Sequence, residues 1–143
     1  MSMDVYVFLK KSDLPPVNIW QNSLAEFDFP VDLYSTFDPN KDSGFVPCKL
    51  RGAVTGFEYF LSPIGEIAST YPDLKEMAQL YDTAAVFSWG SRLDECAVAL
   101  IAAATLATSC SGIMYDPQGG LQYVGASALR YAREIYKQVS AIH

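Results

Sequence analysis

Apolar positions along the chain fall into short runs with strand-like alternation and longer stretches with helical spacing. Residues 3–9 alternate and are rich in Val, Tyr and Phe, which predicts a strand. Residues 84–89 are apolar almost without interruption, which is typical of a strand buried on both faces at the centre of a sheet. Further strands are predicted at 31–35, 112–115 and 121–124, the last two paired as a hairpin through the turn residues 116–120.

Two segments in the middle of the chain have mixed patterns. Residues 45–61 predict either two short strands or one bent strand with a bulge, because Gly52 and Gly56 interrupt the apolar pattern. Residues 37–44 are rich in Asp, Pro, Asn, Ser and Gly, and they predict an acidic, exposed loop.

The longest predicted helix covers residues 93–109 and is apolar nearly all round. Asp94 and Glu95 place negative charge in its first turn, where the helix dipole favours it. Its many alanines predict burial on most sides and close packing against the sheet. Shorter helices are expected from Asn18 as a cap through Phe27, from Pro72 to Tyr81, and from Ser127 as a cap to the end of the chain.

These elements predict one α+β domain over residues 1–143. We expect a mixed or antiparallel sheet packed by the Ala-rich buried helix and by an amphipathic C-terminal helix. A chain of 143 residues that is 50% hydrophobic can form one ordinary core, and it contains no internal repeat.

Charge restricts the classes of partner. Sixteen acidic and ten basic residues give a net charge of −6, and fourteen of the acids lie within the first 100 residues. A chain with this charge is not expected to bind nucleic acid or an anionic membrane surface, so a charged partner is expected to be basic. We expect a cytoplasmic protein, because the N-terminus does not resemble a secretory signal and the apolar stretch 97–107 is too short to span a bilayer.

The sequence carries no strong catalytic, cofactor or metal motif. Its one histidine is His143, and Cys48, Cys96 and Cys110 lack the spacing of a zinc site. No phosphate-binding glycine pattern is present, and sixteen acids produce pairs of neighbouring carboxylates by chance. We therefore expect a protein that is not an enzyme, with no catalytic residues, no cofactor and no bound metal.

One alternative is a small enzyme or an anion- or ligand-binding domain. A buried strand that ends near Ser88 and leads through Ser91 and Arg92 into a helix is a geometry in which backbone N–H groups and an arginine can hold an anion. The competing interpretation is that Ser91 caps the helix and Arg92 pairs with a carboxylate, while Trp89 packs in the core.

Tyrosines and phenylalanines close to acidic residues predict a protein-binding face in the first two thirds of the chain. Aromatic side chains anchor such interfaces, and carboxylates steer a basic partner towards them. The same tyrosines could equally cover strand edges, and a homodimer formed through an exposed sheet edge is a further alternative. The residues predicted to contact a partner are Tyr34, Phe37, Asp38, Asp42, Glu58, Tyr59 and Asp82.

The segments Val86-Phe87-Ser88-Trp89-Gly90 and Gly112-Ile113-Met114-Tyr115-Asp116-Pro117-Gln118-Gly119, with the Ala-rich helix between them, resemble small bacterial α+β domains. Some of these domains serve as cytosolic immunity proteins for contact-dependent or other polymorphic toxins. The resemblance implies a single-domain protein that binds one cognate toxin and blocks its active site, without catalysis or a cofactor. Many such toxins are nucleases with basic clefts. Each interface in this family is particular to its toxin, so the resemblance carries over no functional residues.

Overall fold

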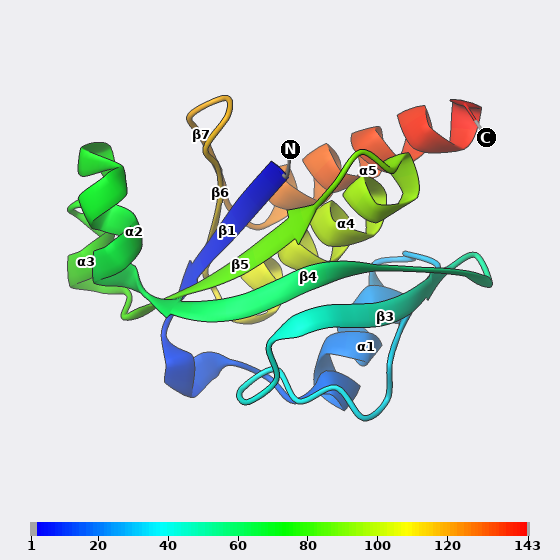
Figure 1. The fold of residues 1–143 in the computed structure, drawn as a ribbon, viewed down its shortest axis with the longest axis horizontal. Helices are drawn as coiled ribbons and strands as arrows, with labels where there is room; N and C mark the ends of the chain where they lie inside the picture. Colours follow the sequence, from blue (N-terminus) through cyan, green and yellow to red (C-terminus); the bar gives the residue numbers. More distant parts are fainter. Residues whose placement is uncertain (1–2, 143) are drawn as a thin grey trace.

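Seven strands form one antiparallel sheet in the computed structural model, which describes residues 3–142. The strand order is β2-β3-β4-β5-β1-β6-β7, so the buried strand at 84–89 lies at the centre of the sheet, as predicted (Figure 1). Of the two predicted sheet types, the antiparallel one is observed. The strands are β1 (Met3–Leu9), β2 (Val31–Leu33), β3 (Gly44–Leu50), β4 (Ala53–Pro63), β5 (Thr83–Trp89), β6 (Ile113–Asp116) and β7 (Leu121–Tyr123).

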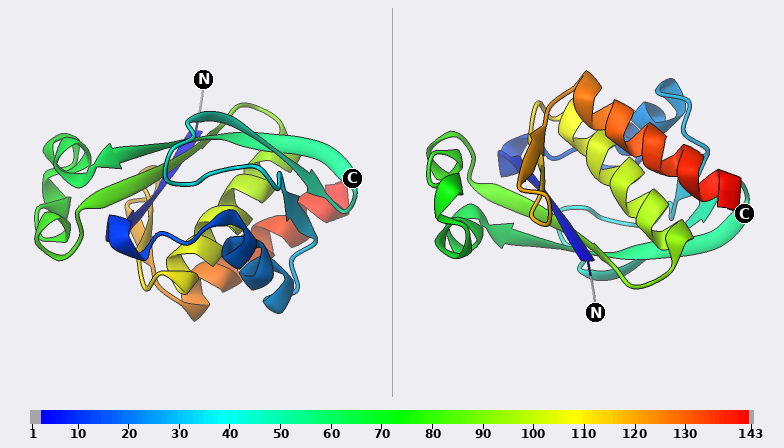
Figure 2. Two further views of the ribbon diagram at one scale, coloured as in Figure 1. Left: turned by 90° about the horizontal axis from the view of Figure 1, so that it is seen from below. Right: turned by 90° about the horizontal axis from the view of Figure 1, so that it is seen from above.

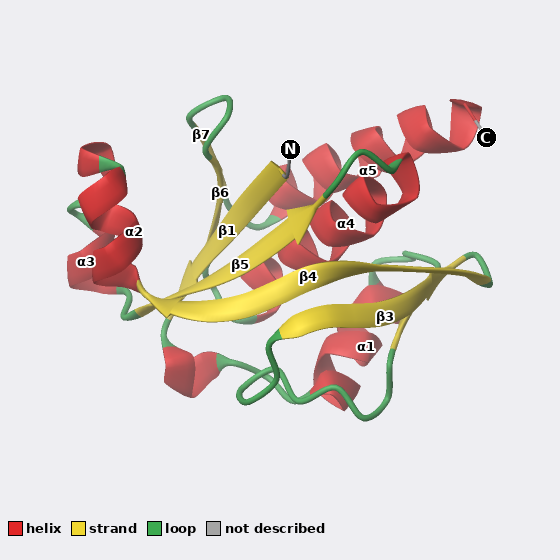
Figure 3. Cartoon of the chain, viewed as in Figure 1, coloured by secondary structure: helices red, strands yellow, loops and turns green. Residues whose placement is uncertain are grey.

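Helices cover the two faces of the sheet unequally. Helices α1 (Val17–Glu26), α4 (Leu93–Ser109) and α5 (Ala126–Ile142) lie on one face, as both views in Figure 2 show. Three short pieces, α2 (Ile64–Thr70), η2 (Pro72–Leu74) and α3 (Met77–Leu80), stand at one end of the sheet (Figure 3). The remaining helical turn is η1 (Lys11–Asp13). The predicted single α+β domain is confirmed.

The main core lies between the sheet and α4. This helix has the predicted bounds, and its residues 97–107 are buried on all sides because the sheet, α1 and α5 pack around them. Trp20 of α1 is fully buried, and its indole Nε1 donates a hydrogen bond of 3.2 Å to the carbonyl of Ala102 in α4. Ala128 and Ala132 of α5 are also fully buried. Small side chains on α4 and α5 let the two helices approach closely, in addition to the packing of α4 against the sheet that its alanines predicted.

Residues 45–61 belong to two strands. The strands β3 and β4 are joined by a two-residue turn in which Arg51 and Gly52 have φ of 51° and 83°, as in the turns that suit a twisted hairpin. The second glycine of this segment, Gly56, lies inside β4 under the ring of Phe45. The absence of a side chain at Gly56 leaves the space that the ring of Phe45 occupies. Gly52 therefore belongs to the turn between the two strands, whereas Gly56 lies within a strand.

The helix predicted from Pro72 to Tyr81 begins at Pro72 but is not continuous, because it is divided into the 3-10 turn η2 and the short helix α3. It follows a helix that was not predicted, α2. A residue before proline avoids the helical conformation, and Tyr71 accordingly has φ −121° and ψ 88°. The apolar side of these pieces, Ile64, Ala68 and Leu74, packs on the second face of the sheet.

The two predicted helix caps also differ from the structure. Helix α1 begins at Val17 after Pro16, so Asn18 lies within its first turn. Helix α5 begins at Ala126, and the Ser127 hydroxyl accepts the N–H of Val124 and donates to its carbonyl. The hydroxyl of Ser127 therefore closes the turn that leads into the helix.

The short outer strand β2 is protected at its free edge by a side chain. The Gln21 amide Nε2 donates to the carbonyl of Val31 at 2.8 Å, and its Oε1 accepts the N–H of Leu33 at 2.7 Å. The amide thus takes the place of a neighbouring strand. None of the described helices is long and apolar enough to cross a bilayer.

Candidate protein-binding face

A large part of the second sheet face carries no helix. Cross-strand registry sets which side chains point there: Asp32 lies opposite Lys49, Phe45 opposite Glu58, and Ser88 opposite both Glu58 and Asp4. Figure 1 looks onto this surface, with α1, α4 and α5 behind the sheet. We call it the open face and define it by Asp4, Asp32, Tyr34, Phe45, Pro47, Lys49, Val54, Glu58, Phe60 and Ser88.

Large apolar side chains are exposed on the open face. Tyr34 and Phe45 are each 54% exposed, Phe60 is 44% exposed and Val54 is 75% exposed. The ring of Phe45 lies against Gly56, so its position is fixed although it is half in solvent. Scattered exposed hydrophobic residues are ordinary, but a group on one sheet face marks an interaction surface.

Carboxylates stand beside these rings. Glu58 is exposed between Phe45 and Ser88 in the sheet. The hydroxyl of Ser88 donates a hydrogen bond to Asp4, which fixes the orientation of that carboxylate. Strand pairing therefore places Phe45, Glu58, Ser88 and Asp4 side by side across four strands, with Phe60 two residues from Glu58 on β4.

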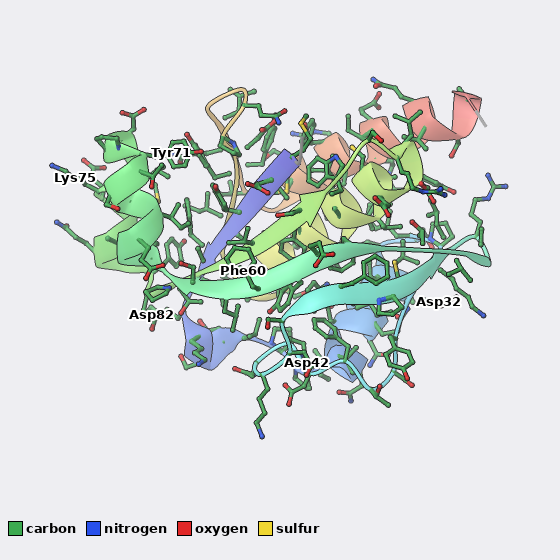
Figure 4. All side chains as sticks on the ribbon, in the orientation of Figure 1. Asp32, Asp42, Phe60, Tyr71, Lys75 and Asp82 are labelled. Carbon is green, nitrogen blue, oxygen red and sulfur yellow. The ribbon has the colours of Figure 1, made fainter. Side chains whose placement is uncertain are left out.

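The helical cap formed by α2, η2 and α3 limits the open face at one end. Tyr6 of β1 and Tyr115 of β6 stack with ring centroids 6.3 Å apart, and Tyr71 packs against both. Burial, with smaller contributions from Tyr71 and Asp4, raises the pKa of Tyr6 above its usual value. Figure 4 shows Tyr71 on the cap and Phe60 on the uncovered sheet beside it. These tyrosines form the base of the cap and the border of the open face.

The structure brings together only some of the residues predicted to contact a partner. Tyr34 and Glu58 lie on the open face, and exposed Asp42 borders a hollow that Tyr34 and Phe45 also line. Asp38 is half-buried, and its Oδ1 accepts the N–H of Asn40, while its own N–H donates to Asp42. Asp38 and Asp42 therefore also hold their own loop together, and reversing their charges would disturb that loop.

Asp82 lies away from this group. Figure 4 shows it near the helical cap, at the opposite end of the sheet from Asp32. Its carboxylate accepts the N–H of Lys11 and the hydroxyl of Thr83, both at 2.8 Å, and these hydrogen bonds lower its pKa. Asp82 thus connects the end of β1 to the start of β5 and lies outside the open face.

Phe37 and Tyr59 are buried, so the prediction that they contact a partner is wrong for both. Their rings pack edge to face with centroids 5.1 Å apart beneath the sheet, and the hydroxyl of Tyr59 donates to the carbonyl of Pro39 at 2.7 Å. Successive residues of a strand point to opposite faces. Tyr59 therefore enters the core, and its neighbour Phe60 reaches the open face.

Sequence reasoning missed Phe60, although a signal for it was present. In β4 the residues Phe57, Tyr59 and Leu61 alternate with Glu58, Phe60 and Ser62. Phe60 therefore points to the same side of the strand as Glu58 and Ser62, and two polar neighbours on that side indicate that it does not face the core. Asp4 carried no such signal, because only pairing of β1 with β5 brings it to Ser88.

The residues of the predicted anion site do not form one site. Ser88 points to the open face, where its partner is the carboxylate of Asp4. Arg92 precedes α4 and donates two hydrogen bonds to Asp94, which hold the pKa of that carboxyl below its usual value. Arg92 also lines a separate hollow of about 320 Å³ with Arg51. Ser91 is exposed and makes no side-chain cap for α4, so the competing interpretation is confirmed for Arg92 and wrong for Ser91.

Within residues 3–142, no group of three or more His, Cys, Asp and Glu side chains is arranged to hold a metal ion. The three cysteines are free, and burial raises the pKa of the Cys48 thiol to about 12. Comparisons with protein-family models, with curated proteins and with solved structures found no match.

Proposed function

We propose that this protein is a non-catalytic binding protein that captures a basic protein partner on its open face. The observation that carries the proposal is the pair of exposed phenylalanines, Phe45 and Phe60, beside the carboxylates of Asp4 and Glu58 on an uncovered sheet. Aromatic anchors supply most of the binding free energy at many interfaces, and surrounding charges supply selectivity and association rate.

Among binding proteins, a toxin-neutralising immunity protein agrees best with the charge of the chain and with the resemblance over residues 84–124. Such a protein would cover a basic cleft, as a nuclease toxin has, with its own acidic surface. The net charge of −6 would speed the encounter with such a partner, and Phe45 and Phe60 would hold the complex once formed.

The test uses the product of the gene adjacent to this one, with binding followed by calorimetry and by stopped-flow association. We expect Phe60→Ala to weaken binding by about 1–3 kcal/mol, as for an anchor residue. We expect Glu58→Lys to slow association, and salt at about 500 mM to slow it for the unaltered protein.

A matched control is Leu121→Ala, because Leu121 is an exposed apolar residue of β7 that lies outside the open face. The control should bind as the unaltered protein does. Equal binding by Phe60→Ala and Leu121→Ala would refute the open face as the interface, and failure of the adjacent gene product to bind would refute the immunity role.

A further inference from the structure

Three hollows adjoin one another around β3. The first, of about 400 Å³, lies beside Asp32 and Val54, and shares Tyr34 and Pro47 with the second, of about 210 Å³. The second shares Phe45 with the third, of about 170 Å³, which reaches Glu58 and Ser88. The three hollows therefore lie in a row and share lining residues, and Phe45 stands between the second and the third; we call the row the groove.

The groove follows the direction of β3 and then crosses towards β5. Four residues of a strand separate Lys49 from Phe45, and two strand spacings separate Phe45 from Ser88. At about 3.3 Å per residue and 4.8 Å per strand, the path measures roughly 23 Å, which about seven extended residues would fill. Figure 4 shows Asp32 and Phe60 along the same face of the sheet.

The edge of β3 is open beside the second hollow. The N–H of Tyr34 donates to the carbonyl of Pro47 at 3.2 Å, and β2 pairs with β3 only from Cys48 onwards. Backbone groups of alternate strand residues point the same way, so the N–H and carbonyl of Phe45 face the side that β2 leaves uncovered. Proline at position 47 has no N–H with which to extend this ladder.

The lining of the groove is apolar and negatively charged. Tyr34, Phe45 and Val54 are its most exposed apolar residues. Its carboxylates are Asp32, Asp42, Glu58 and Glu95, whereas Lys49 is its one basic residue among the residues that the structure describes. A ligand of complementary chemistry is therefore cationic and partly apolar.

We propose that this groove binds an extended segment of the partner protein that carries alternating basic and apolar side chains. The inference rests on the proposed function and specifies the part of the partner that docks. Alternate side chains of an extended segment point in opposite directions, so the basic set can face the carboxylates while the apolar set faces the exposed rings of Tyr34 and Phe45. Nucleic acid, anionic lipid and a second copy of this acidic chain all oppose the charge of the groove.

The third hollow is suited to a lysine or arginine head group. Glu58 and Glu95 supply two carboxylates, and the half-exposed ring of Phe45 supplies an aromatic surface. A cation close to an aromatic ring is attracted to it, and adjacent carboxylates add to this attraction. The basic side chain nearest to Phe45 is therefore expected to contribute most to selectivity.

The test uses a synthetic octapeptide of alternating arginine and valine with blocked ends as the probe. It is titrated into the ¹⁵N-labelled full chain, and amide shifts are followed by NMR. We expect saturable shifts at Val54, Phe45, Glu58 and Ser88. Two comparison peptides replace arginine by glutamate, or place the same arginines on an alanine-based helix, and both are expected to bind at least about tenfold more weakly.

The protein variant for this test is the double substitution Glu58→Gln and Glu95→Gln, which we expect to weaken peptide binding at least about fivefold. Its matched control is Glu26→Gln with Glu134→Gln, which removes the same charge from α1 and α5. Equal weakening by both pairs, shifts at other surfaces, or equal binding of the helical or acidic peptide would overturn the proposal.

The outcomes separate this inference from the proposed function. If the adjacent gene product binds in a manner sensitive to Phe60→Ala while the peptide neither binds nor competes, the function stands and the extended segment is wrong. If the peptide binds the groove and the gene product does not bind at all, the groove stands and the proposed partner is wrong.

Discussion

Tyr59 and Phe60 are adjacent aromatic residues with opposite roles. Tyr59 lies in the core with its hydroxyl bonded to Pro39, whereas Phe60 is exposed on the open face. The neighbouring carboxylate of Glu58 favoured Tyr59 as a contact residue in the sequence. The alternation of side chains along β4 determines which of the two is buried, since neighbouring residues of a strand point to opposite faces of the sheet.

Gly56 has no room for a larger side chain. A Cβ at this position would overlap the ring of Phe45 and lie 2.5 Å from the carbonyl oxygen of Val46. Because that carbonyl belongs to the paired backbone of β3, it can move only if the pairing of β3 with β4 is disturbed. We expect Gly56→Ala to lower the free energy of unfolding by about 1–3 kcal/mol, measured by urea denaturation.

The control for Gly56→Ala is Gly65→Ala in α2. Nothing lies within 4 Å of a Cβ built at Gly65, and its backbone is helical. Alanine there should leave stability unchanged or raise it by up to about 1 kcal/mol. A Gly56→Ala protein as stable as the Gly65→Ala protein would show that Phe45 does not need the space above position 56.

At the scale of elements, α4 and α2 show where local pattern suffices and where it does not. The bounds of α4 agree with the prediction because its apolar run is long and Gly90, Ser91 and Gly112 flank it. Helix α2 has seven residues, including a glycine, and its local signal is weak. It forms because Ile64 and Ala68 cover Phe8 and Ala84 on the sheet, which are contacts that no local window contains.

Helices α4 and α5 pack against each other through small side chains. Ala128 is fully buried on α5, in the core cluster that contains the alanines of α4. A larger side chain would force the two helices apart. We expect Ala128→Leu to lower the free energy of unfolding by about 1–3 kcal/mol in urea denaturation.

A leucine on the outer side of the same helix serves as the control. Gln138 is exposed, so Gln138→Leu should change stability by no more than about 0.5 kcal/mol. If the two leucine variants unfolded at the same urea concentration, the small residues on α5 would not be what allows the helices to approach.

At the scale of the whole molecule, the two sheet faces serve different purposes. One face carries the main core under α1, α4 and α5, and the other is only partly covered by α2, η2 and α3. An uncovered antiparallel face is usually polar. Here it also carries Phe45 and Phe60, so part of the apolar content of the chain belongs to a surface and not to a core.

The open face is not expected to pair with the open face of a second copy. The open face carries Asp4 and Glu58, and the chain has a net charge of −6, so two copies placed face to face would repel. We expect sedimentation equilibrium at low salt to give the mass of one chain, 15.7 kDa. A mass about twice as large that returns to one chain in Phe60→Ala would instead make the open face a homodimer interface.

The sequence by itself determined the α+β class, the bounds of β1 and α4, and the central place of β5, because each follows from a local pattern of apolar residues. Only the tertiary structure decided the open face. Phe45 and Glu58 belong to one hairpin, but Asp4 and Ser88 come from strands far from it in the chain, and cross-strand registry brings the four together. Registry depends on the pairing of whole strands, and no local stretch of sequence contains both partners of the pair Asp4 and Ser88 or of the pair Glu58 and Ser88.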